Sequence, residues 1–379
     1  MNATATEIRL ADCVDLLAGF AFKSDRFQDP GSGGVPLVKG ENIGQGRILW
    51  DISRYWPSNE DGLDKFRLLP GDVVLAMDRP WVPAGLKWAV IRDGDPDAFL
   101  VQRCARLRSR SPDLRQDFLR YVIGGPGFEA YIRPITTGVN VPHISGAQIL
   151  GYNFRLPPVE EQKRIAGILS AYDDLIENCE RRIRVLDEMA RSLYREWFVD
   201  NPPASKRRSG LLGDMIELHR GYDLPASARL DGTVPIVSSS GPTGWHNEAK
   251  MSPPGVVTGR YGTLGSVFLV MEPYWPLNTT LYVSDFKGSD PVFVYFLLSS
   301  LDLSRQNTAG AVPGLNRNAL HLLPVKIPDA DSQARFGAVA GENMRHIDLL
   351  KVRIKNLRAT RDLLLPRLLS GQLSVDDAA

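Results

Sequence analysis

One motif occurs twice in this chain, and the repeat limits the folds available to it. The segment DCVDLLAGF at residues 12–20 returns as DMIELHRGY at 214–222, with acid, apolar, apolar, acid, Leu, Gly and aromatic positions in register. Shorter matches follow both copies in the same order, and they pair residues 35–38 with 234–237, 70–74 with 254–258, 141–144 with 312–315, and 154–157 with 325–328. Two copies of a domain on one chain indicate a single ligand that is bound at two places.

Both copies have the sequence pattern of strand-rich domains. Short apolar runs, such as residues 72–75 in the first copy and 265–270 in the second, alternate with turns that contain Gly and Pro. Such runs predict short strands, and the pattern at residues 114–123 predicts one of a few helices. We therefore predict a first mixed α/β domain over residues 1–157 and a second over residues 211–328.

A long helix is predicted between the two domains. From Glu160 to Phe198 the chain has no Pro and a single Gly, Gly167. Apolar residues occupy every position of a heptad seam in this stretch, namely Ile165, Leu169, Tyr172, Ile176, Cys179, Ile183, Leu186, Ala190, Leu193 and Trp197. A seven-residue period held over about five heptads predicts a coiled coil, because a straight helix drifts away from that repeat. The alternative is an amphipathic helix that lies on a globular core.

A similar helical pattern follows the second domain, over residues 329–379. Its apolar seam consists of Phe336, Ala340, Ile347, Leu350, Ile354, Leu357, Leu364 and Leu368. Asn343 and Arg361 interrupt this seam, as polar residues do where register is fixed at a cost in stability. Pro366 is expected to end or kink the helix, and Gly371 is expected to mark its final stop.

These patterns define a domain plan. A central coiled-coil helix over residues 158–200 and a linker over 201–210 join the two domains, and a C-terminal coiled-coil helix follows. The predicted fold class is α+β, with two repeated mixed α/β domains separated by two long antiparallel coiled-coil helices. A helix of about 38 residues is roughly 57 Å long, so the pair would serve as a spacer between the two domains.

Composition narrows the possible classes of protein. The net charge is +1, so a nucleic-acid-binding function requires Lys and Arg to be focused on particular faces. Cys13, Cys104 and Cys179 are scattered and odd in number, which favours a reducing compartment such as the cytoplasm over a disulfide framework or a zinc site. The apolar runs are too short for a membrane span.

Motifs for catalysis are weak. The tetrad NPPA at residues 201–204 is similar to the Asn-Pro-Pro-aromatic motif of amino-methyltransferases, but Ala204 replaces the aromatic ring that would stack a flipped base. The sequence has neither a Gly-rich dinucleotide-binding turn nor a phosphate-binding Gly-Lys-Ser/Thr loop. Asp231, Glu248 and Lys250 imitate a metal-nuclease set that arises easily by chance. We therefore assign no catalytic residue, metal or cofactor to this chain.

Candidate DNA-binding residues lie in turn-like segments at corresponding points of the two copies. Their side chains are types that pair with base edges and phosphates. The first copy supplies Arg79, Trp81, Lys87, Thr136, Thr137, Asn140 and His143, and the second supplies Ser239, His246, Asn247, Arg260, Tyr261, Thr263, Asn278, Arg305, Asn307, Asn316 and Arg317. A run of arginines, Arg103, Arg106, Arg108 and Arg110, could also line a phosphate track. For any single residue the alternative is an ordinary solvated loop or strand face.

Taken together, these features resemble the specificity subunits of type I restriction–modification systems over the whole length of the chain. The resemblance rests on the two repeats and on the segments PPVEEQ at 157–162, REWFVD at 195–200 and LLPRLLSGQL at 364–373. It implies that each globular domain recognises one half of a bipartite double-stranded DNA target. It also implies that the helices set the spacing and dock methyltransferase subunits, two in number, and that restriction subunits can join.

The resemblance places the chemistry in the partner subunits, which would bring S-adenosylmethionine, ATP and magnesium. The partner-docking and coiled-coil residues would be Ile165, Tyr172, Ile176, Ile183, Leu186, Leu193, Trp197, Ile347, Leu350, Ile354, Leu357 and Leu364. Two alternatives stay open from the residues alone: a stand-alone DNA adenine methyltransferase, and a two-headed protein–protein adaptor. The target sequence, its spacer length and the loops that contact bases do not follow from this pattern.

Overall fold

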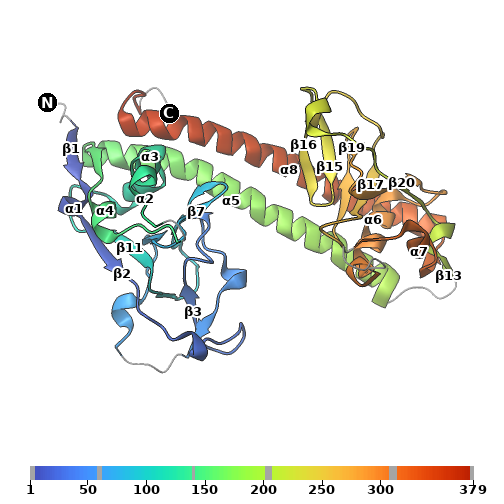
Figure 1. The fold of residues 1–379 in the computed structure, drawn as a ribbon, viewed down its shortest axis with the longest axis horizontal. Helices are drawn as coiled ribbons and strands as arrows, with labels where there is room; N and C mark the ends of the chain where they lie inside the picture. Colours follow the sequence, from blue (N-terminus) through green and yellow to red (C-terminus); the bar gives the residue numbers. More distant parts are fainter. Residues whose placement is uncertain (1–4, 58–61, 139–140, 201–206, 307–313, 376–379) are drawn as a thin grey trace. The chain divides into compact units, whose positions relative to one another are not determined.

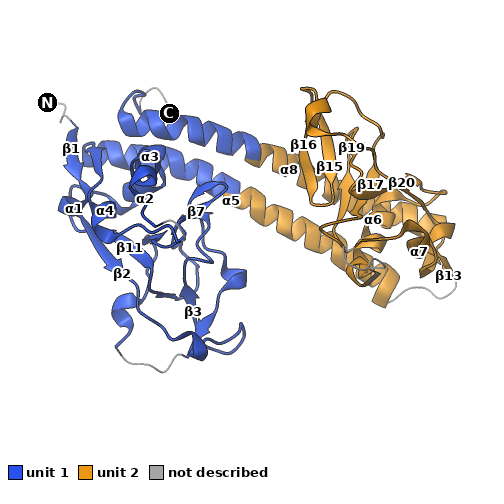
Figure 2. Cartoon of the chain, in the orientation of Figure 1, with its two compact units in different colours: residues 1–176, 355–379 blue, residues 177–354 orange. Residues whose placement is uncertain are grey.

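A computed structural model describes residues 5–57, 62–138, 141–200, 207–306 and 314–375. The NPPA tetrad and the predicted DNA contacts Asn140 and Asn307 lie outside these ranges. The chain divides into two compact units (Figure 2). Unit 1 comprises residues 1–176 and 355–379, and unit 2 comprises residues 177–354. Both divisions fall inside long helices, whereas the predicted domain boundaries lie at the helix ends.

Unit 1 is built around a sheet with the strand order β2-β11-β6-β9-β4 (Figure 1). A smaller sheet has the order β10-β3-β5, and the remaining strands form the pairs β1-β12 and β7-β8. Its strands are β1 (Thr6–Arg9), β2 (Val14–Ala18), β3 (Val35–Val38), β4 (Gln45–Gly46), β5 (Tyr55–Trp56), β6 (Val73–Ala76), β7 (Trp81–Val82), β8 (Gly85–Leu86), β9 (Trp88–Val90), β10 (Phe99–Leu100), β11 (Cys104–Ser109) and β12 (Asn153–Leu156). Its shorter helices are α1 (Leu10–Cys13), α2 (Gln116–Gly124), α3 (Pro126–Ile135) and α4 (Gly146–Leu150), with 3-10 turns at Ser24–Arg26, Trp50–Ile52 and Asp64–Phe66.

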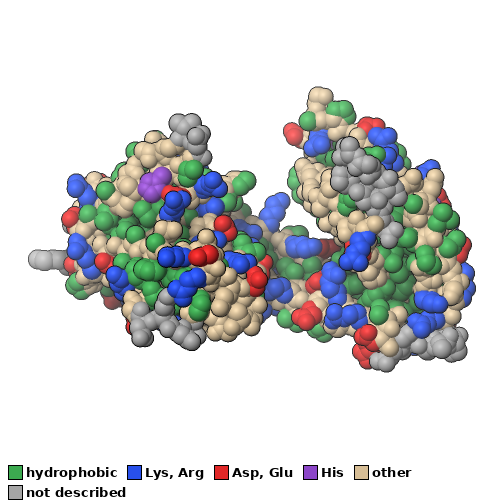
Figure 3. Space-filling model, turned by 60° about the horizontal axis from the view of Figure 1, so that its bottom comes forward, with side chains coloured by type: hydrophobic (Ala, Val, Ile, Leu, Met, Phe, Trp, Pro, Cys, Tyr) green, Lys and Arg blue, Asp and Glu red, His purple; other side chains and the backbone are tan. Residues whose placement is uncertain are grey.

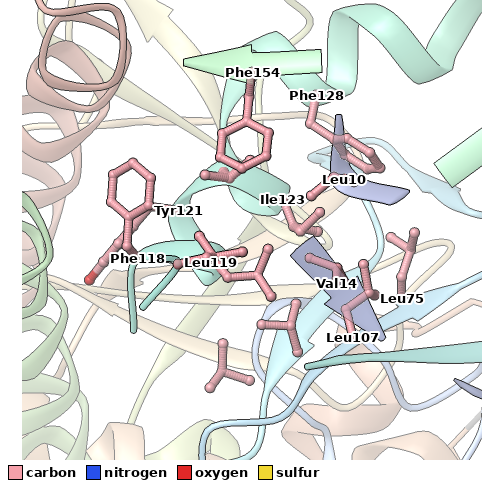
Figure 4. Packing of buried hydrophobic residues seen from close by; sticks show 14 of the residues in the cluster. Leu10, Val14, Leu75, Leu107, Phe118, Leu119, Tyr121, Ile123, Phe128 and Phe154 are labelled. Carbon is pink, nitrogen blue, oxygen red and sulfur yellow. The ribbon is translucent and has the colours of Figure 1, made fainter. Parts of the chain in front are cut away.

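Strand β6 lies inside unit 1 because it is apolar on both faces. All four of its residues are buried, and it pairs with both β11 and β9. Leu75 of β6 and Leu107 of β11 pack in one core with Phe118 of α2 (Figure 4). This packing explains why a short apolar run between turns forms a central strand.

Unit 2 repeats this plan with a sheet in the order β14-β20-β17-β18, a second sheet in the order β16-β15-β19, and the pair β13-β21. Its strands are β13 (Arg207–Leu211), β14 (Glu217–Arg220), β15 (Val234–Ser238), β16 (Gly241–His246), β17 (Gly255–Gly259), β18 (Val267–Val270), β19 (Trp275–Pro276), β20 (Thr280–Asp285) and β21 (Pro324–Pro328). Its shorter helices are α6 (Pro291–Ser300) and α7 (Arg317–His321), with 3-10 turns at Leu212–Asp214, Ala226–Ala228 and Leu303–Gln306. Strand β13 includes residues 207–210, so the end of the predicted linker is in fact a paired strand.

The two long helices are present as predicted. Helix α5 (Val159–Arg195) continues into a π-helical turn at Glu196–Asp200, and α8 spans Ala330–Ser370. All twenty seam positions are buried or half-buried. Seam residues toward the helix ends, such as Ile165 and Ala190, also belong to the domain cores. Those parts of the helices therefore match the predicted alternative of a helix that lies on a globular core.

The order of contacts in each unit makes the helices antiparallel. In unit 1 Ile165, near the start of α5, shares a core with Leu368, near the end of α8. In unit 2 Ala190, near the end of α5, shares a core with Phe336, near the start of α8. Of the helices in the described ranges, none is both long and apolar enough to cross a membrane.

Polar and breaking residues in α8 have local explanations. Arg361 in the seam donates a hydrogen bond of 2.8 Å to Asp173 of α5, so its buried charge is paired. Pro366 does not end the helix, which continues to Ser370. The predicted stop at Gly371 is confirmed, because this residue has φ +76°, a conformation that favours glycine.

Candidate nucleic-acid interface

In unit 1, three segments distant in sequence meet beyond the end of β6. They are residues 77–80, 101–103 and 141–144, and we call this place the unit 1 junction. The Met77 N–H donates to the Arg103 carbonyl at 2.8 Å, and the Ile144 N–H donates to the Met77 carbonyl at 2.8 Å. These bonds fix the backbone from which several polar side chains project.

Unit 2 has an equivalent junction beyond the end of β17, formed by residues 259–262, 277–279 and 314–317. The Arg260 N–H donates to the Thr279 carbonyl at 2.8 Å, and the Leu315 N–H donates to the Arg260 carbonyl at 2.9 Å. The sequence repeat is therefore realised as a repeated backbone network at one place in each unit.

Each junction contains an isolated β-bridge, and the two bridges refine the alignment of the repeat. The bridge in unit 1 joins Asp78 to His143, and the bridge in unit 2 joins Tyr261 to Gly314. The sequence match pairs Val74 with Thr258, so unit 1 has one more residue than unit 2 between the strand and the junction. Asp78 and Tyr261 therefore occupy equivalent positions.

At the unit 1 junction a carboxylate organises two donors. His143 Nδ1 lies 2.5 Å from Asp78 Oδ1, and the Arg103 guanidinium lies 3.0 Å from Asp78 Oδ2. The Arg103 side chain is 68% exposed, so this ion pair holds a cation at the surface. Thr137 forms a backbone bridge with His143 and is exposed.

The junction also holds two arginines in a conformation that is uncommon outside glycine. Arg79 has φ +45° and Arg103 has φ +65°. Such a backbone costs free energy and persists only where the surroundings impose it. The Arg79 N–H donates to the Pro142 carbonyl at 2.7 Å, which is one such restraint.

At the unit 2 junction the surface forms a cleft of about 430 Å³. Its lining is mostly polar or cationic and consists of Arg220, Arg260, Tyr261, Leu281, Gly314, Leu315, Asn316, Arg317 and Asn318. The fold thus brings together four predicted residues, Arg260, Tyr261, Asn316 and Arg317. Arg220 and Asn318 were not among the predicted residues, although Arg220 lies within the repeated motif.

Side-chain contacts orient the groups in this cleft. The Arg260 guanidinium lies 4.4 Å from the centre of the Tyr261 ring and donates to the Tyr261 hydroxyl at 3.2 Å. Asn316 caps α7, because its side-chain oxygen accepts from the Asn318 N–H at 2.9 Å. The side-chain NH₂ of Asn316 is therefore the group that can donate a hydrogen bond to a ligand. Three arginines beside amides and a phenol suit an anionic, hydrogen-bonding ligand.

Charges of both signs are mixed on the surface. Figure 3 shows one face of the molecule, on which Lys and Arg side chains lie among acidic, apolar and polar ones. This mixture agrees with the net charge of +1.

Several predicted contacts have partners within the fold. His246 is only 4% exposed, and its Nδ1 accepts from the Leu230 N–H at 3.1 Å, so its predicted contact with DNA is not supported. Lys87 Nζ donates to the Gly40 carbonyl at 3.0 Å, and Thr136 Oγ1 donates to the Ile132 carbonyl at 2.9 Å. The Arg133 guanidinium lies over the Trp81 ring, 4.3 Å from the centre of that ring.

The remaining predicted contacts of unit 2 that the structure describes do not line the cleft, although Asn278 belongs to the segment 277–279 of the unit 2 junction. Asn247 and Thr263 are exposed, and Ser239 is half-buried. Arg305 is exposed and pairs with Asp302 at 2.8 Å. Asn278 donates a hydrogen bond to Asp223, which also pairs with Arg220 at 3.2 Å.

The predicted phosphate track of arginines is wrong for its middle members. Arg106 is 8% exposed and pairs with Asp15 at 2.7 Å. Arg108 binds the buried carboxylate of Asp72, and this hydrogen bond raises the pKa of Arg108. Both side chains therefore stabilise the sheet, and Arg103 alone of the run belongs to the junction.

The Cys104 thiol, next to the unit 1 junction, is buried. Burial raises the pKa of the Cys104 thiol to about 12, so it stays protonated near neutral pH. Within the described ranges, no group of three or more His, Cys, Asp or Glu side chains could hold a metal ion. The arrangement can bind and discriminate a ligand.

Comparison with known proteins identifies similar chains. Residues 2–188 match the family model described as the type I restriction modification DNA specificity domain. A segment of 173 residues, 45% of this chain, is 33% identical to the MjaVIII specificity subunit of Methanocaldococcus jannaschii and covers 40% of it. A segment of 174 residues, 46% of this chain, is 32% identical to the EcoAI specificity subunit of Escherichia coli and covers 28% of it. The matches thus span less than half the length of these curated relatives.

The fold also has a solved counterpart. The crystal structure of a type I restriction–modification S subunit from M. genitalium superposes with a TM-score of 0.69 and covers 97% of this chain and 96% of its own. Its sequence identity is 17%, so the likeness concerns the fold.

Proposed function

We propose that this chain, whose residues 2–188 match the family model of the type I restriction modification DNA specificity domain, is a specificity subunit that recognises a bipartite DNA sequence and docks methyltransferase subunits. The observation that carries the proposal is the pair of equivalent junctions. Each unit brings Arg and other hydrogen-bonding side chains to the same place in its fold. One half of the target would bind at each junction.

Recognition would result from a higher affinity for the target DNA sequence than for other DNA sequences. Exposed cations such as Arg103 and Arg317 are suited to phosphates, and these contacts set the position of the protein on the duplex. Groups with directional donors, such as the Asn316 amide and the Arg260 guanidinium, are suited to base edges in the major groove. Because the two junctions carry different side chains, the two half-sites should differ in sequence.

The test is an exchange of unit 1 for that of a relative with a different target. The exchange should include residues 355–379 together with residues 1–176, because both segments build unit 1. In the complex with methyltransferase subunits, we expect methylation mapping to show a change in one half-site only. A change in both halves would contradict separate recognition, and DNA binding that does not depend on salt would contradict the DNA-reading function itself.

Docking of partner subunits is supported by apolar side chains that the helices leave at the surface. Val185 and Met189 on α5 are 51% and 56% exposed, and Leu349 and Val352 on α8 are 65% and 58% exposed. Spacings of four and three residues put each pair on one helix face. We infer that methyltransferase subunits, two per chain, cover such faces, with restriction subunits joining through them.

Charge substitutions can test the docking face. Met189→Asp should weaken co-purification of methyltransferase subunits while leaving the isolated chain folded, because the side chain is already exposed. Arg184→Asp, at an exposed position of the same helix, is the matched control. Equal retention of partners by both variants would rule out this face.

The helices would also set the distance between half-sites. Helix α5 is continuous from residues of unit 1 into residues of unit 2, which supports a spacer role. One heptad added to both helices lengthens each by about 10 Å, or roughly three base pairs. The preferred gap in a library of targets should then grow while both half-sequences stay the same, and an unchanged gap in an assembled variant would contradict the spacer role.

Catalysis would reside in the partners, which would supply S-adenosylmethionine, ATP and magnesium. The isolated chain should then neither methylate nor cleave DNA. The three cysteines are buried and free, which supports a reducing compartment, the cytoplasm.

A further inference from the structure

The two copies of the repeated motif end in an aromatic residue that the fold leaves partly exposed. Phe20 is 38% exposed and Tyr222 is 39% exposed. Each follows a glycine and forms an isolated parallel bridge, with Val101 in unit 1 and with Leu277 in unit 2. Two rings at equivalent positions with almost equal exposure form a repeated surface feature.

The backbone at both positions is held by the same bonds. The Phe20 N–H donates to the Leu100 carbonyl at 2.9 Å, and the Tyr222 N–H donates to the Pro276 carbonyl at 2.8 Å. A Cβ on the preceding glycine would overlap the carbonyl oxygen of Val101 in unit 1, and the same overlap recurs in unit 2. Glycine is therefore required for the close approach that presents each ring.

Each ring is also supported from within its unit. Phe20 packs against Phe22 and Phe66, with ring centres 4.9 Å and 5.2 Å away. The Tyr222 hydroxyl forms a 2.9 Å hydrogen bond with the Tyr282 hydroxyl, and burial together with this bond raises the pKa of Tyr282. The rings are thus presented at the surface in fixed positions, at little further cost in conformational entropy on binding.

Both rings adjoin the junctions. In unit 1 the Gln102 N–H donates to the Phe20 carbonyl at 2.7 Å, and Gln102 precedes Arg103 of the unit 1 junction. In unit 2 Tyr222 lies two residues after Arg220, which lines the cleft. Each ring is therefore connected through the backbone to a segment that carries an arginine of the junction or of its cleft.

We propose that Phe20 and Tyr222 pack on deoxyribose rings of the DNA backbone beside the phosphates that the junction arginines bind. The inference rests on the proposed DNA-reading function. The side chains of the two junctions differ, as expected of groups that read different half-sites, whereas the aromatic position is shared. A shared residue fits the part of DNA that does not vary with sequence, which is the sugar–phosphate backbone. The apolar face of a sugar suits an aromatic ring that has no charged partner.

The test uses the full chain assembled with its methyltransferase subunits. Phe20→Ala should weaken DNA binding roughly three- to eightfold, because 38% of the surface of Phe20 is available for burial. The base preference of both half-sites and the dependence of affinity on salt should stay unchanged, because the ring contacts neither base edges nor phosphates. Phe20→Tyr should restore affinity, since Tyr serves at the equivalent place in unit 2.

Leu69→Ala is the matched control, because Leu69 is 49% exposed and precedes β6, at the opposite end from the junction. Tyr222→Ala should act as Phe20→Ala does, and the two losses should multiply in the double variant. If Phe20→Ala binds as Leu69→Ala does, or alters the preference for one base pair, the sugar contact is wrong. If the unaltered complex lacks salt-dependent binding, the DNA-reading function itself fails.

Discussion

Unit 1 holds its junction with a carboxylate, whereas unit 2 uses an aromatic ring at the equivalent position. Asp78 binds His143 and Arg103, and Tyr261 lies under the Arg260 guanidinium. Two backbone hydrogen bonds next to these residues recur in both units. The difference teaches that the two copies of the fold keep the place of the junction while its side chains differ, as the proposed recognition of two different half-sites requires.

The largest effect should come from a charge in either core. Leu368→Asp in unit 1 and Ile347→Asp in unit 2 bury a carboxylate at sites that are 0% and 3% exposed. We expect each to destabilise its own unit by at least about 3 kcal/mol, because the charge has no partner. Hydrogen exchange resolved by peptide should show the loss within that unit.

Controls for this comparison are Leu363→Asp and Leu349→Asp, whose side chains are 64% and 65% exposed. Their stability should change little. If a core charge in one unit unfolded both equally, the two units would not be separate cooperative bodies.

The two glycines of the repeat should behave alike. Gly19→Ala and Gly221→Ala each force a methyl group into a neighbouring carbonyl oxygen. We expect a loss of about 1–3 kcal/mol in the stability of the corresponding unit. Chemical denaturation followed by hydrogen exchange would measure the stability of each unit in both variants. A large loss of stability in only one variant would show that the motif has different roles in the two units.

The cations of the two junctions should contribute comparably to affinity. Arg103→Ala and Arg317→Ala should each weaken DNA binding about fivefold to tenfold and lower the slope of log affinity against log salt by roughly one. Gel-shift titrations over a salt series would measure this. Arg181→Ala, an exposed arginine of α5, is the control.

The smallest effect is a difference in acid sensitivity. His321 in unit 2 accepts the Leu218 N–H at 2.9 Å through Nε2, and burial lowers the pKa of His321. Neutral His321 therefore contributes stability that is present above its unfolded pKa of about 6.5 and is lost as pH falls through the lower folded value. Exchange protection around β14 should decrease modestly at pH 5 relative to pH 7, and His321→Gln should remove that pH dependence.

Periodic features were predictable from sequence because they are local. The seams of α5 and α8 follow from residues seven apart, and the stop at Gly371 follows from one glycine. Strands such as β6 follow from apolar runs between turns. Each of these elements is determined by neighbours along the chain.

The sites were less predictable because each joins three distant segments. Arg220 lies inside a motif that was identified as a repeat, yet only the fold places it beside Arg317 in the cleft. His246 has the polar character of a surface loop, yet the β15–β16 pairing buries it. Whether a loop side chain packs within the fold or is exposed to a ligand depends on tertiary packing. Local sequence patterns do not reveal that packing.

Unit 1 is discontinuous, and this has a consequence for biosynthesis. Leu365, Leu368 and Val375 complete a core whose other members are residues 10–169. On the ribosome, the residues of unit 2 are synthesised between these two parts. Unit 2 can therefore fold while the hydrophobic core of unit 1 is still incomplete. A chain interrupted after residue 354 would expose the unfinished core of unit 1 to chaperones and proteases, and only chains that extend beyond it can complete both units.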